Sequence, residues 1–217
     1  MGENLIRYLT MAVVVVTALP VHEAAHGWVA DRLGDRTARN AGRLTLNPLA
    51  HLDLFGSLAL LLFGFGWAKP VPVNPSQMRK PKSGLVLTAL AGPASNILMA
   101  GIVMILFKVY LNFAPVGTAS GVVFGQIIYT VLQTNLTLAV FNLLPVPPLD
   151  GSTLLTALLP VKWRMKLIKL EKVFYIALIL LLYLGVLQIP MNWAAKLLFN
   201  GLDRVTVWVD LLLQLAG

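Results

Sequence analysis

Long apolar runs dominate the pattern of hydrophobic and polar positions along the chain. A helix that crosses a bilayer needs about 20 mostly apolar residues. Four runs meet or approach that length: 8–30, 83–107, 121–145 and 173–190. Two shorter apolar runs differ, because 54–68 contains three glycines and 205–217 is interrupted by an aspartate. The pattern predicts an all-α polytopic membrane protein with about four to six transmembrane helices.

The segments between these runs differ in charge, which predicts their sides of the membrane. Most of the 17 Lys and Arg residues lie in three segments: 31–53, 69–82 and 161–172. Basic residues collect in cytoplasmic loops, so we expect these segments inside the cell and the uncharged 111–120 outside. Because 54–68 then joins two loops on one side, it should not cross the membrane. Its glycines and the prolines after it predict a re-entrant or short β-like segment near 54–75, and a short tilted span is the alternative.

Composition supports a membrane protein and excludes several other classes. Of the 217 residues, 58% are hydrophobic and 12% are charged, which is about half the charged fraction of a soluble domain. The absence of cysteine excludes thiol catalysis, cysteine-ligated zinc and a disulfide scaffold. The net charge of +8 would suggest nucleic acid for a soluble protein, but basic loops account for it here. We expect a single membrane-embedded domain over 1–217, with the lipid bilayer as a partner and no nucleic acid.

Candidate chemistry lies inside the first apolar run, which contains His22-Glu23-Ala24-Ala25-His26. Positions i and i+4 share one face of a helix. Two imidazoles there can bind one Zn²⁺, and Glu23 can act as general base on a water that the metal polarises. In a soluble helix, two surface histidines would be the ordinary interpretation. Ionisable residues within a membrane span are costly and normally functional, so the run predicts a metal site.

A catalytic zinc site needs a third protein ligand, and the sequence contains one strong candidate. Asp150 directly follows the third apolar run in an otherwise uncharged stretch, and the loop charges place it at the same leaflet as the two histidines. The alternative is that Asp150 only caps a helix over 151–159. For His51 and Asp53, which lie in an arginine-bearing loop, a structural role is favoured over ligation.

Several motifs together resemble the site-2 protease family of intramembrane zinc metalloproteases. They occur in order along most of 15–155: HEAAH at 22–26, NPLAHLD at 47–53, GWAKPVPVNP at 66–75, GPASN at 92–96 and NLLPVPPLDG at 142–151. The final 60 residues are similar only in being hydrophobic. The chain resembles the small bacterial members, without an inserted PDZ or CBS domain.

The resemblance implies a zinc metalloendopeptidase that carries out regulated intramembrane proteolysis of single-pass membrane proteins. It implies that His22, His26 and Asp150 ligate one Zn²⁺ per chain. Glu23 would activate the zinc-bound water and pass its proton to the leaving amine. Asn96 and Asn142 would hydrogen-bond the substrate backbone or the oxyanion, and interhelical hydrogen bonding is the alternative for both.

Peptide hydrolysis in a membrane requires water and an unwound substrate. We therefore expect a multi-pass protein of the plasma membrane whose active site opens toward the cytoplasm, and we expect 69–75 to hold the substrate by strand addition. The rival function is a membrane metal transporter or metal-binding protein, because transporters also place His and Asp in spans. Glu23 distinguishes the two, since a general base beside a metal suits hydrolysis.

Overall fold

Helices account for nearly all of the regular structure. The structure, a computed structural model, describes residues 2–53, 55–56, 68–114 and 118–216. Its elements are α1 (Gly2–Arg32), α2 (Thr37–Asn40), α3 (Pro48–His51), the 3-10 helix η1 (Pro75–Gln77), α5 (Pro81–Phe113), α6 (Ala119–Asn142), α7 (Asp150–Leu158), α8 (Val161–Lys169), α9 (Glu171–Tyr183), α10 (Gln188–Val205) and α11 (Val207–Ala216). Within those ranges the β structure is a single antiparallel bridge between Leu52 and Ala68. The predicted all-α class is confirmed.

Three helices are long and apolar enough to cross a membrane: Ala12–Arg32 within α1, Pro81–Phe113, and Ser120–Asn142 within α6. The pair α9 and α10 adds a fourth if it counts as one broken span, because the two helices meet at 83°. Four spans match the lower end of the predicted number. The predicted re-entrant stretch 54–68 lies mostly outside the described residues.

Local sequence explains where the long helices begin and end. α5 begins with Pro81, at a position where the missing N–H leaves no intrahelical bond unmade. α6 begins after Thr118, whose hydroxyl accepts the Gly121 N–H at 3.1 Å. α9 ends at Tyr183, and Gly185 follows in the left-handed region with φ +71°, a common helix terminator. The apolar run 173–190 therefore does not form one continuous helix, because the chain turns before α10.

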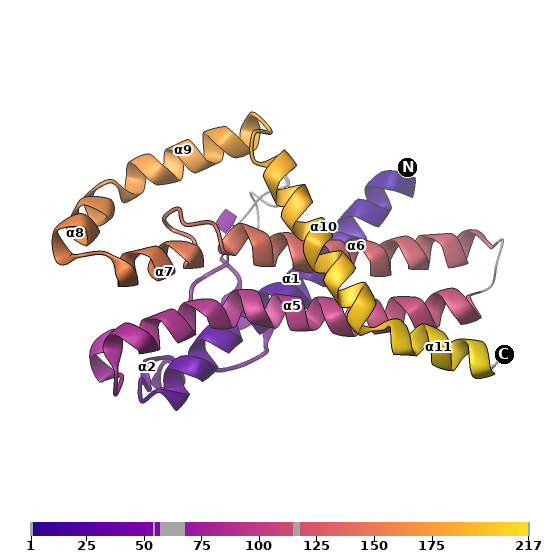
Figure 1. Ribbon diagram of the computed structural model, residues 1–217, viewed down its shortest axis with the longest axis horizontal. Coiled ribbons are helices and arrows are strands. Elements are labelled where there is room, and N and C mark those ends of the chain that lie inside the picture. Colours follow the sequence, from indigo (N-terminus) through magenta and orange to yellow (C-terminus); the bar gives the residue numbers. More distant parts are fainter. Residues whose placement is uncertain (1, 54, 57–67, 115–117, 217) are drawn as a thin grey trace.

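α5 and α6 lie side by side, α1 crosses them, and α10 packs over them (Figure 1). Met104, Leu132 and Leu136 are fully buried between these helices. α7 packs on α5, whereas α8 and α9 extend as an arm from the same end of the molecule. At the opposite end, Lys108 of α5 pairs with Asp203 at 2.9 Å and with Asp210 at 2.5 Å. The last helix, α11, is thereby held near the end of α5 that precedes the α5–α6 linker.

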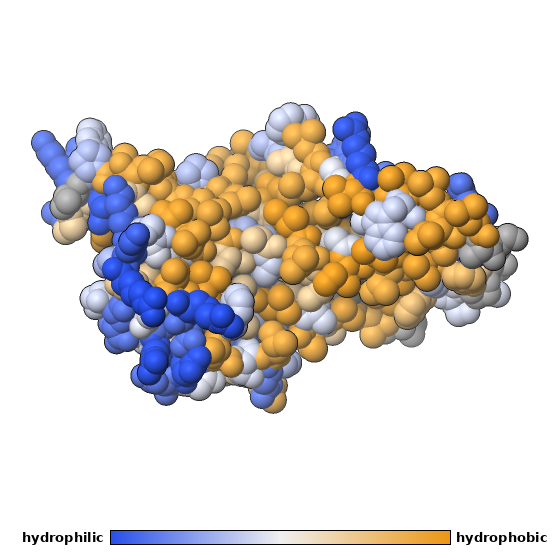
Figure 2. Space-filling model, turned by 60° about the horizontal axis from the view of Figure 1, so that its bottom comes forward, coloured by the Kyte–Doolittle hydropathy of each residue, from blue (hydrophilic) through white to orange (hydrophobic). Residues whose placement is uncertain are grey.

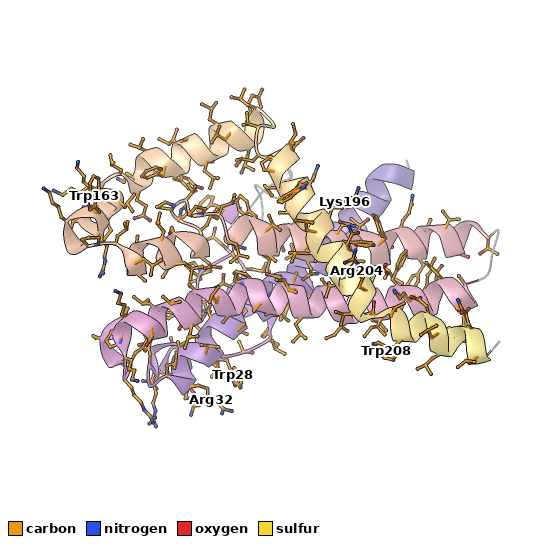
Figure 3. All side chains as sticks on the ribbon, in the orientation of Figure 1. Trp28, Arg32, Trp163, Lys196, Arg204 and Trp208 are labelled. Atoms are coloured by element: carbon orange, nitrogen blue, oxygen red, sulfur yellow. The ribbon has the colours of Figure 1, made fainter. Side chains whose placement is uncertain are left out.

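The surface has the polarity of a membrane protein. Apolar side chains cover most of the face in Figure 2, and hydrophilic residues gather toward one end. Trp28 stacks with Arg32 at 4.7 Å and Trp163 with Lys166 at 5.2 Å, and Figure 3 places both tryptophans at that end. Tryptophan and basic residues are enriched together at membrane interfaces. This end is therefore one water-facing boundary of the molecule.

Candidate metal centre

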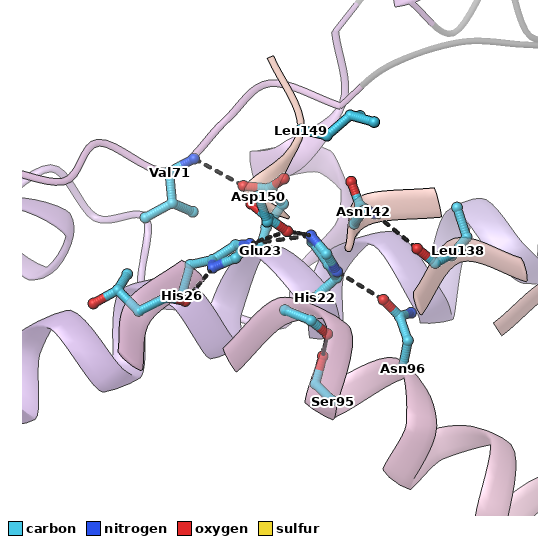
Figure 4. Close-up of polar contacts among 12 residues, drawn as sticks. His22, Glu23, His26, Val71, Ser95, Asn96, Leu138, Asn142, Leu149 and Asp150 are labelled. Carbon is cyan, nitrogen blue, oxygen red and sulfur yellow. Dashed lines mark hydrogen bonds and ion pairs between the residues drawn. The ribbon is translucent and has the colours of Figure 1, made fainter. Parts of the chain in front are cut away.

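Three side chains from two distant parts of the sequence converge beside α5 (Figure 4). His22 and His26 are one turn apart on α1, and their Nε2 atoms lie 3.0 Å from each other. Oδ2 of Asp150, the first residue of α7, lies 3.2 Å from Nε2 of His22 and 3.3 Å from Nε2 of His26. Both histidines are buried, with 7% and 9% of their surfaces exposed. The described residues thus contain a compact group of two imidazoles and one carboxylate.

Two glycines leave the space that this convergence needs. A Cβ on Gly92 of α5 would collide with ring atoms of both His22 and His26. A Cβ on Gly151 would collide with the backbone carbonyls of Leu143 and Leu144. The first glycine lets α5 approach the rings, and the second lets the turn after α6 close against the start of α7. Asp150 is therefore brought to the two rings by close backbone packing at Gly151, which only a residue without a side chain allows.

Both imidazoles are oriented by acceptors on α5. Nδ1 of His22 lies 2.7 Å from Oδ1 of Asn96, and Nδ1 of His26 lies 2.7 Å from the Thr88 carbonyl oxygen. A carbonyl oxygen can only accept, so Nδ1 of each ring carries the proton and donates it. Each Nε2 then presents a lone pair toward the other ring and toward Asp150. This is the tautomer that a metal-ligating histidine needs.

The centre therefore brings three acceptors together. Two neutral Nε2 atoms and a carboxylate at these distances repel one another unless a cation lies among them. Oδ2 of Asp150 is buried without a conventional hydrogen-bond partner. Two neutral imidazoles and one ionised carboxylate form a donor set typical of a catalytic zinc site.

Glu23 lies beside the two rings and is held by the extended segment 68–75. Its Oε2 accepts the Val71 N–H at 2.9 Å. The same segment is anchored at Asn74, whose N–H donates to Oδ2 of buried Asp35 at 2.6 Å. Burial raises the pKa of Asp35, but hydrogen bonds from Thr37 and Asn74 outweigh it and lower the pKa below 3.8. An ionised Asp35 thus fixes the segment that positions Glu23.

A cavity of about 570 Å³ opens onto the centre. His22, Glu23, His26 and Asp150 line it, together with Val71 and other residues: Leu19, Ala68, Pro70, Val73, Leu85, Thr88, Ala89, Leu138, Phe141, Asn142, Pro148, Leu149, Thr153 and Tyr175. The space is large enough for a stretch of peptide, and most of its lining is apolar.

The residues proposed from sequence separate into groups. His22, His26 and Asp150 meet at one point, and Glu23 and Asn142 line the adjacent cavity. Asn96 instead lies behind His22, 1% exposed, with its amide facing other polar groups of the protein.

Two alternatives from the sequence are also decided. Leu149 precedes α7 without a side-chain cap, and the carboxylate of Asp150 faces the histidines, so the capping alternative for Asp150 is wrong. His51 is the last residue of α3, and its Nε2 is 2.8 Å from the Thr45 carbonyl, whereas Asp53 accepts the Gly56 N–H at 2.8 Å. These local contacts favour a structural role for both residues over ligation.

Sequence reasoning missed three groups that orient the centre: the Thr88 carbonyl, the Val71 N–H and the side chain of Asn135. Asn135 is fully buried in α6 and contacts Asn96. A signal for Asn135 existed, because it is an amide within an apolar run, as Asn96 is. Backbone groups have no such signal, since every residue but proline carries them.

Comparison with known proteins identifies related chains. A family model described as Peptidase family M50 matches residues 115–185. "Putative zinc metalloprotease YwhC" of Bacillus subtilis is 40% identical over 181 residues, which cover 82% of this chain and 81% of that protein. Proteins named in the same way are Rip2 of Mycolicibacterium smegmatis, 33% identical over 62% of this chain and 51% of that protein, and MJ0611 of Methanocaldococcus jannaschii, 27% identical over 70% and 72%. No solved structure matches.

Proposed function

This chain belongs to peptidase family M50, and on that basis we propose that it hydrolyses peptide bonds of membrane-spanning proteins within or near the membrane plane. The resemblance to site-2 proteases is thereby confirmed, and the chain is a zinc metalloprotease by family. The observation that supports this proposal is the convergence of Asp150, at the start of α7, on His22 and His26 of the apolar helix α1, next to Glu23.

His22, His26 and Asp150 are the residues that would hold one zinc ion per chain. Their ligand atoms, tautomers and ionisation fit that metal, because a cation among three acceptors relieves their mutual repulsion. The bound ion supplies Lewis acidity, which polarises the scissile carbonyl and lowers the pKa of an attacking water. The protein keeps Nε2 of each ring unprotonated and holds the Asp150 carboxylate beside the two rings.

Glu23 is the proposed general base. Its carboxylate lines the cavity next to the rings, where it can accept a proton from the attacking water and deliver it to the leaving amine nitrogen. Its hydrogen bond from Val71 fixes one carboxylate oxygen and leaves the other for this transfer. A general base beside a metal suits hydrolysis.

Asn142 is the proposed partner of the substrate backbone or the oxyanion. It lines the cavity at the end of α6, where its Nδ2 lies 3.1 Å from the Leu138 carbonyl. An amide has two N–H donors, so one remains for a carbonyl oxygen on which charge develops during attack. Asn96 is better described as a residue that positions His22.

The extended segment 69–75 is the proposed binding edge for an unwound substrate. Pro70 and Pro72 lack N–H groups, whereas Val71 and Val73 retain theirs and line the cavity. Alternate residues of an extended strand present their backbone to the same edge, so this edge can pair with a peptide that enters the cavity. Because the Val71 N–H is already bonded to Glu23, the test is made at Val73: Val73→Pro should abolish cleavage with zinc still bound, whereas Val73→Ala should retain it. Equal cleavage by both variants would refute strand addition.

The expected substrates are single-pass membrane proteins, and the expected location is the plasma membrane with the centre toward the cytoplasm. The basic segments and the interfacial tryptophans lie at the end of the molecule that holds α2 and α8. Positive residues favour the cytoplasmic side. Water would therefore reach the cavity from that side.

The test uses the purified protein in detergent, a generic transmembrane substrate and the isosteric change Glu23→Gln. The variant should bind zinc as wild type does and cleave at least about 100-fold more slowly, the lower range for a lost general base. Glu171→Gln makes the same chemical change at an exposed position and should cleave normally. Full activity of Glu23→Gln would refute the mechanism. Zinc flux into vesicles without any cleavage would favour the transporter.

A further inference from the structure

We propose that Asn135 is a positioning residue that acts through Asn96 to set the tautomer of His22, and with it the capacity of His22 to bind metal. The inference rests on the proposed function only in taking His22 as a metal ligand. It assigns a role to a buried polar residue on α6 that does not touch the centre.

Four groups on three helices form one continuous chain of hydrogen bonds. Nδ1 of His22 on α1 donates to Oδ1 of Asn96 on α5 at 2.7 Å. Nδ2 of Asn96 donates to Oδ1 of Asn135 on α6 at 3.2 Å, and Nδ2 of Asn135 donates to the Val131 carbonyl at 2.9 Å. Asn96 is 1% exposed and Asn135 is 0% exposed, so bulk water does not compete for these groups.

The direction of every bond follows from the last acceptor. The Val131 carbonyl can only accept, so Asn135 must present its NH₂ group there and its oxygen toward Asn96. Asn96 must then present its NH₂ group to that oxygen, which turns its own oxygen toward His22. The imidazole therefore places its proton on Nδ1 and leaves Nε2 as a lone pair.

Without Asn135, none of the other hydrogen bonds in this series fixes which way the Asn96 amide is turned. An asparagine side chain presents an acceptor or a donor with almost the same shape. A turned Asn96 would offer an N–H to Nδ1 of His22, which favours the tautomer with its proton on Nε2, where the metal binds. His26 does not have this ambiguity, because a backbone carbonyl fixes its Nδ1 directly.

The experiment has two readouts on the full-length protein: the His22 tautomer, from ¹⁵N-histidine NMR of the metal-free form, and zinc affinity, from competition with a chromogenic chelator. Asn135→Leu should shift His22 toward the Nε2–H tautomer and weaken zinc binding by about 10- to 100-fold, as loss of groups behind metal ligands does. Gln133→Leu is the matched control, because Gln133 lies on the same helix and donates to Tyr129, and it should change neither readout.

A rescue separates positioning from packing. A carboxylate at 96 can only accept, so Asn96→Asp should impose the Nδ1–H tautomer without help from α6. Asn96→Asp combined with Asn135→Leu should therefore bind zinc within a few-fold of Asn96→Asp alone. Wild-type tautomer and affinity in Asn135→Leu, or a loss that Asn96→Asp fails to restore, would overturn the proposal. A wild-type protein that binds no zinc would refute the proposed function instead, and the tautomer in Asn135→Leu would still decide the role of Asn135.

Discussion

At the level of single residues, the space beside Gly92 allows the imidazoles of His22 and His26 to pack together against α5. Its Cα sits against ring atoms of both histidines, where a single methyl group would collide. The glycine is unfavourable within a helix by about 0.5–1 kcal/mol relative to alanine. The close approach of α5 to the two rings explains why a glycine is needed at this position. The centre thus depends on a missing side chain as much as on the ligands themselves.

Gly92→Ala should therefore displace at least one ring and lower zinc affinity by about tenfold or more, measured by chelator competition. Gly101→Ala on the same helix is the control, because a Cβ there would make only an ordinary contact with Leu202 at 3.6 Å. The control should keep wild-type affinity and be as stable or slightly more stable. Unchanged zinc binding by Gly92→Ala would contradict the crowded geometry.

Single residues also show which parts of the centre could be predicted from sequence. The spacing of His22 and His26 fixes a shared helix face, and Asp150 is the carboxylate after the third apolar run, so their meeting was predictable. The partner of Asn96 was not, because it depends on how α1 crosses α5. The same holds for Asn135, whose role appears only when three helices are placed together.

At the element scale, the extended segment 68–75 connects a loop anchor to the proposed general base. Asp35 accepts hydrogen bonds from Thr37 and Asn74 on its two carboxylate oxygens, and Val71 in the same segment donates to Glu23. A shift of the anchor should move the Val71 N–H and with it the carboxylate. The segment is therefore a structural support for catalysis as well as a binding edge.

Asp35→Asn tests this support, because an amide has only one acceptor oxygen for two sets of donors. The variant should lose about 1–3 kcal/mol of stability at neutral pH, the cost of one buried hydrogen-bond partner, and should cleave more slowly with zinc content unchanged. The folded-state pKa of Asp35 lies below 3.8, so its contribution is present above that value and is lost as the pH falls through the folded pKa. Thermal unfolding should show the gap between variant and wild type closing in acid. A gap that widens there would contradict this role.

The helices themselves were largely predictable, and the exception has a local cause. α1, α5, α6 and α7 follow the apolar runs and the expected helix over 151–159. The run 173–190 has no charged residue to mark its interruption, so hydropathy alone predicts one helix there. Gly185 is the stop signal, and its left-handed conformation turns the chain into α10.

At the scale of the whole molecule, the two ends differ in chemistry. One end carries the basic segments around α2 and α8, and the other carries the end of α5, the start of α6 and α11. The ion pairs of Lys108 with Asp203 and Asp210 hold the last two helices at that second end. α9 and α10 together lead the chain from the first end to the second, where α11 lies. Hydropathy alone could not establish at which end the tail 205–217 would lie.

Because the chain has no cysteine, single cysteines can report this arrangement in intact cells. Gln77→Cys and Leu170→Cys should resist a membrane-impermeant thiol reagent until the cells are lysed. Asn112→Cys and Gln214→Cys should be labelled from outside. All four positions are exposed and uncharged, so the substitutions leave the positive charges that determine orientation unchanged. Labelling of Gln77→Cys from outside would reverse the proposed orientation, and protection of Gln214→Cys would contradict the crossing by α9 and α10.

X-ray absorption at the zinc edge of the purified protein can show directly whether two imidazoles and one carboxylate bind a single ion. We expect one zinc per chain, with scattering from two imidazoles at about 2.0–2.1 Å and from oxygen ligands at about 2.0–2.2 Å. Substitution of Asp150 by alanine should remove an oxygen ligand or the metal itself. A protein that binds no stoichiometric zinc, or a zinc ion without imidazole in its coordination sphere, would contradict the account.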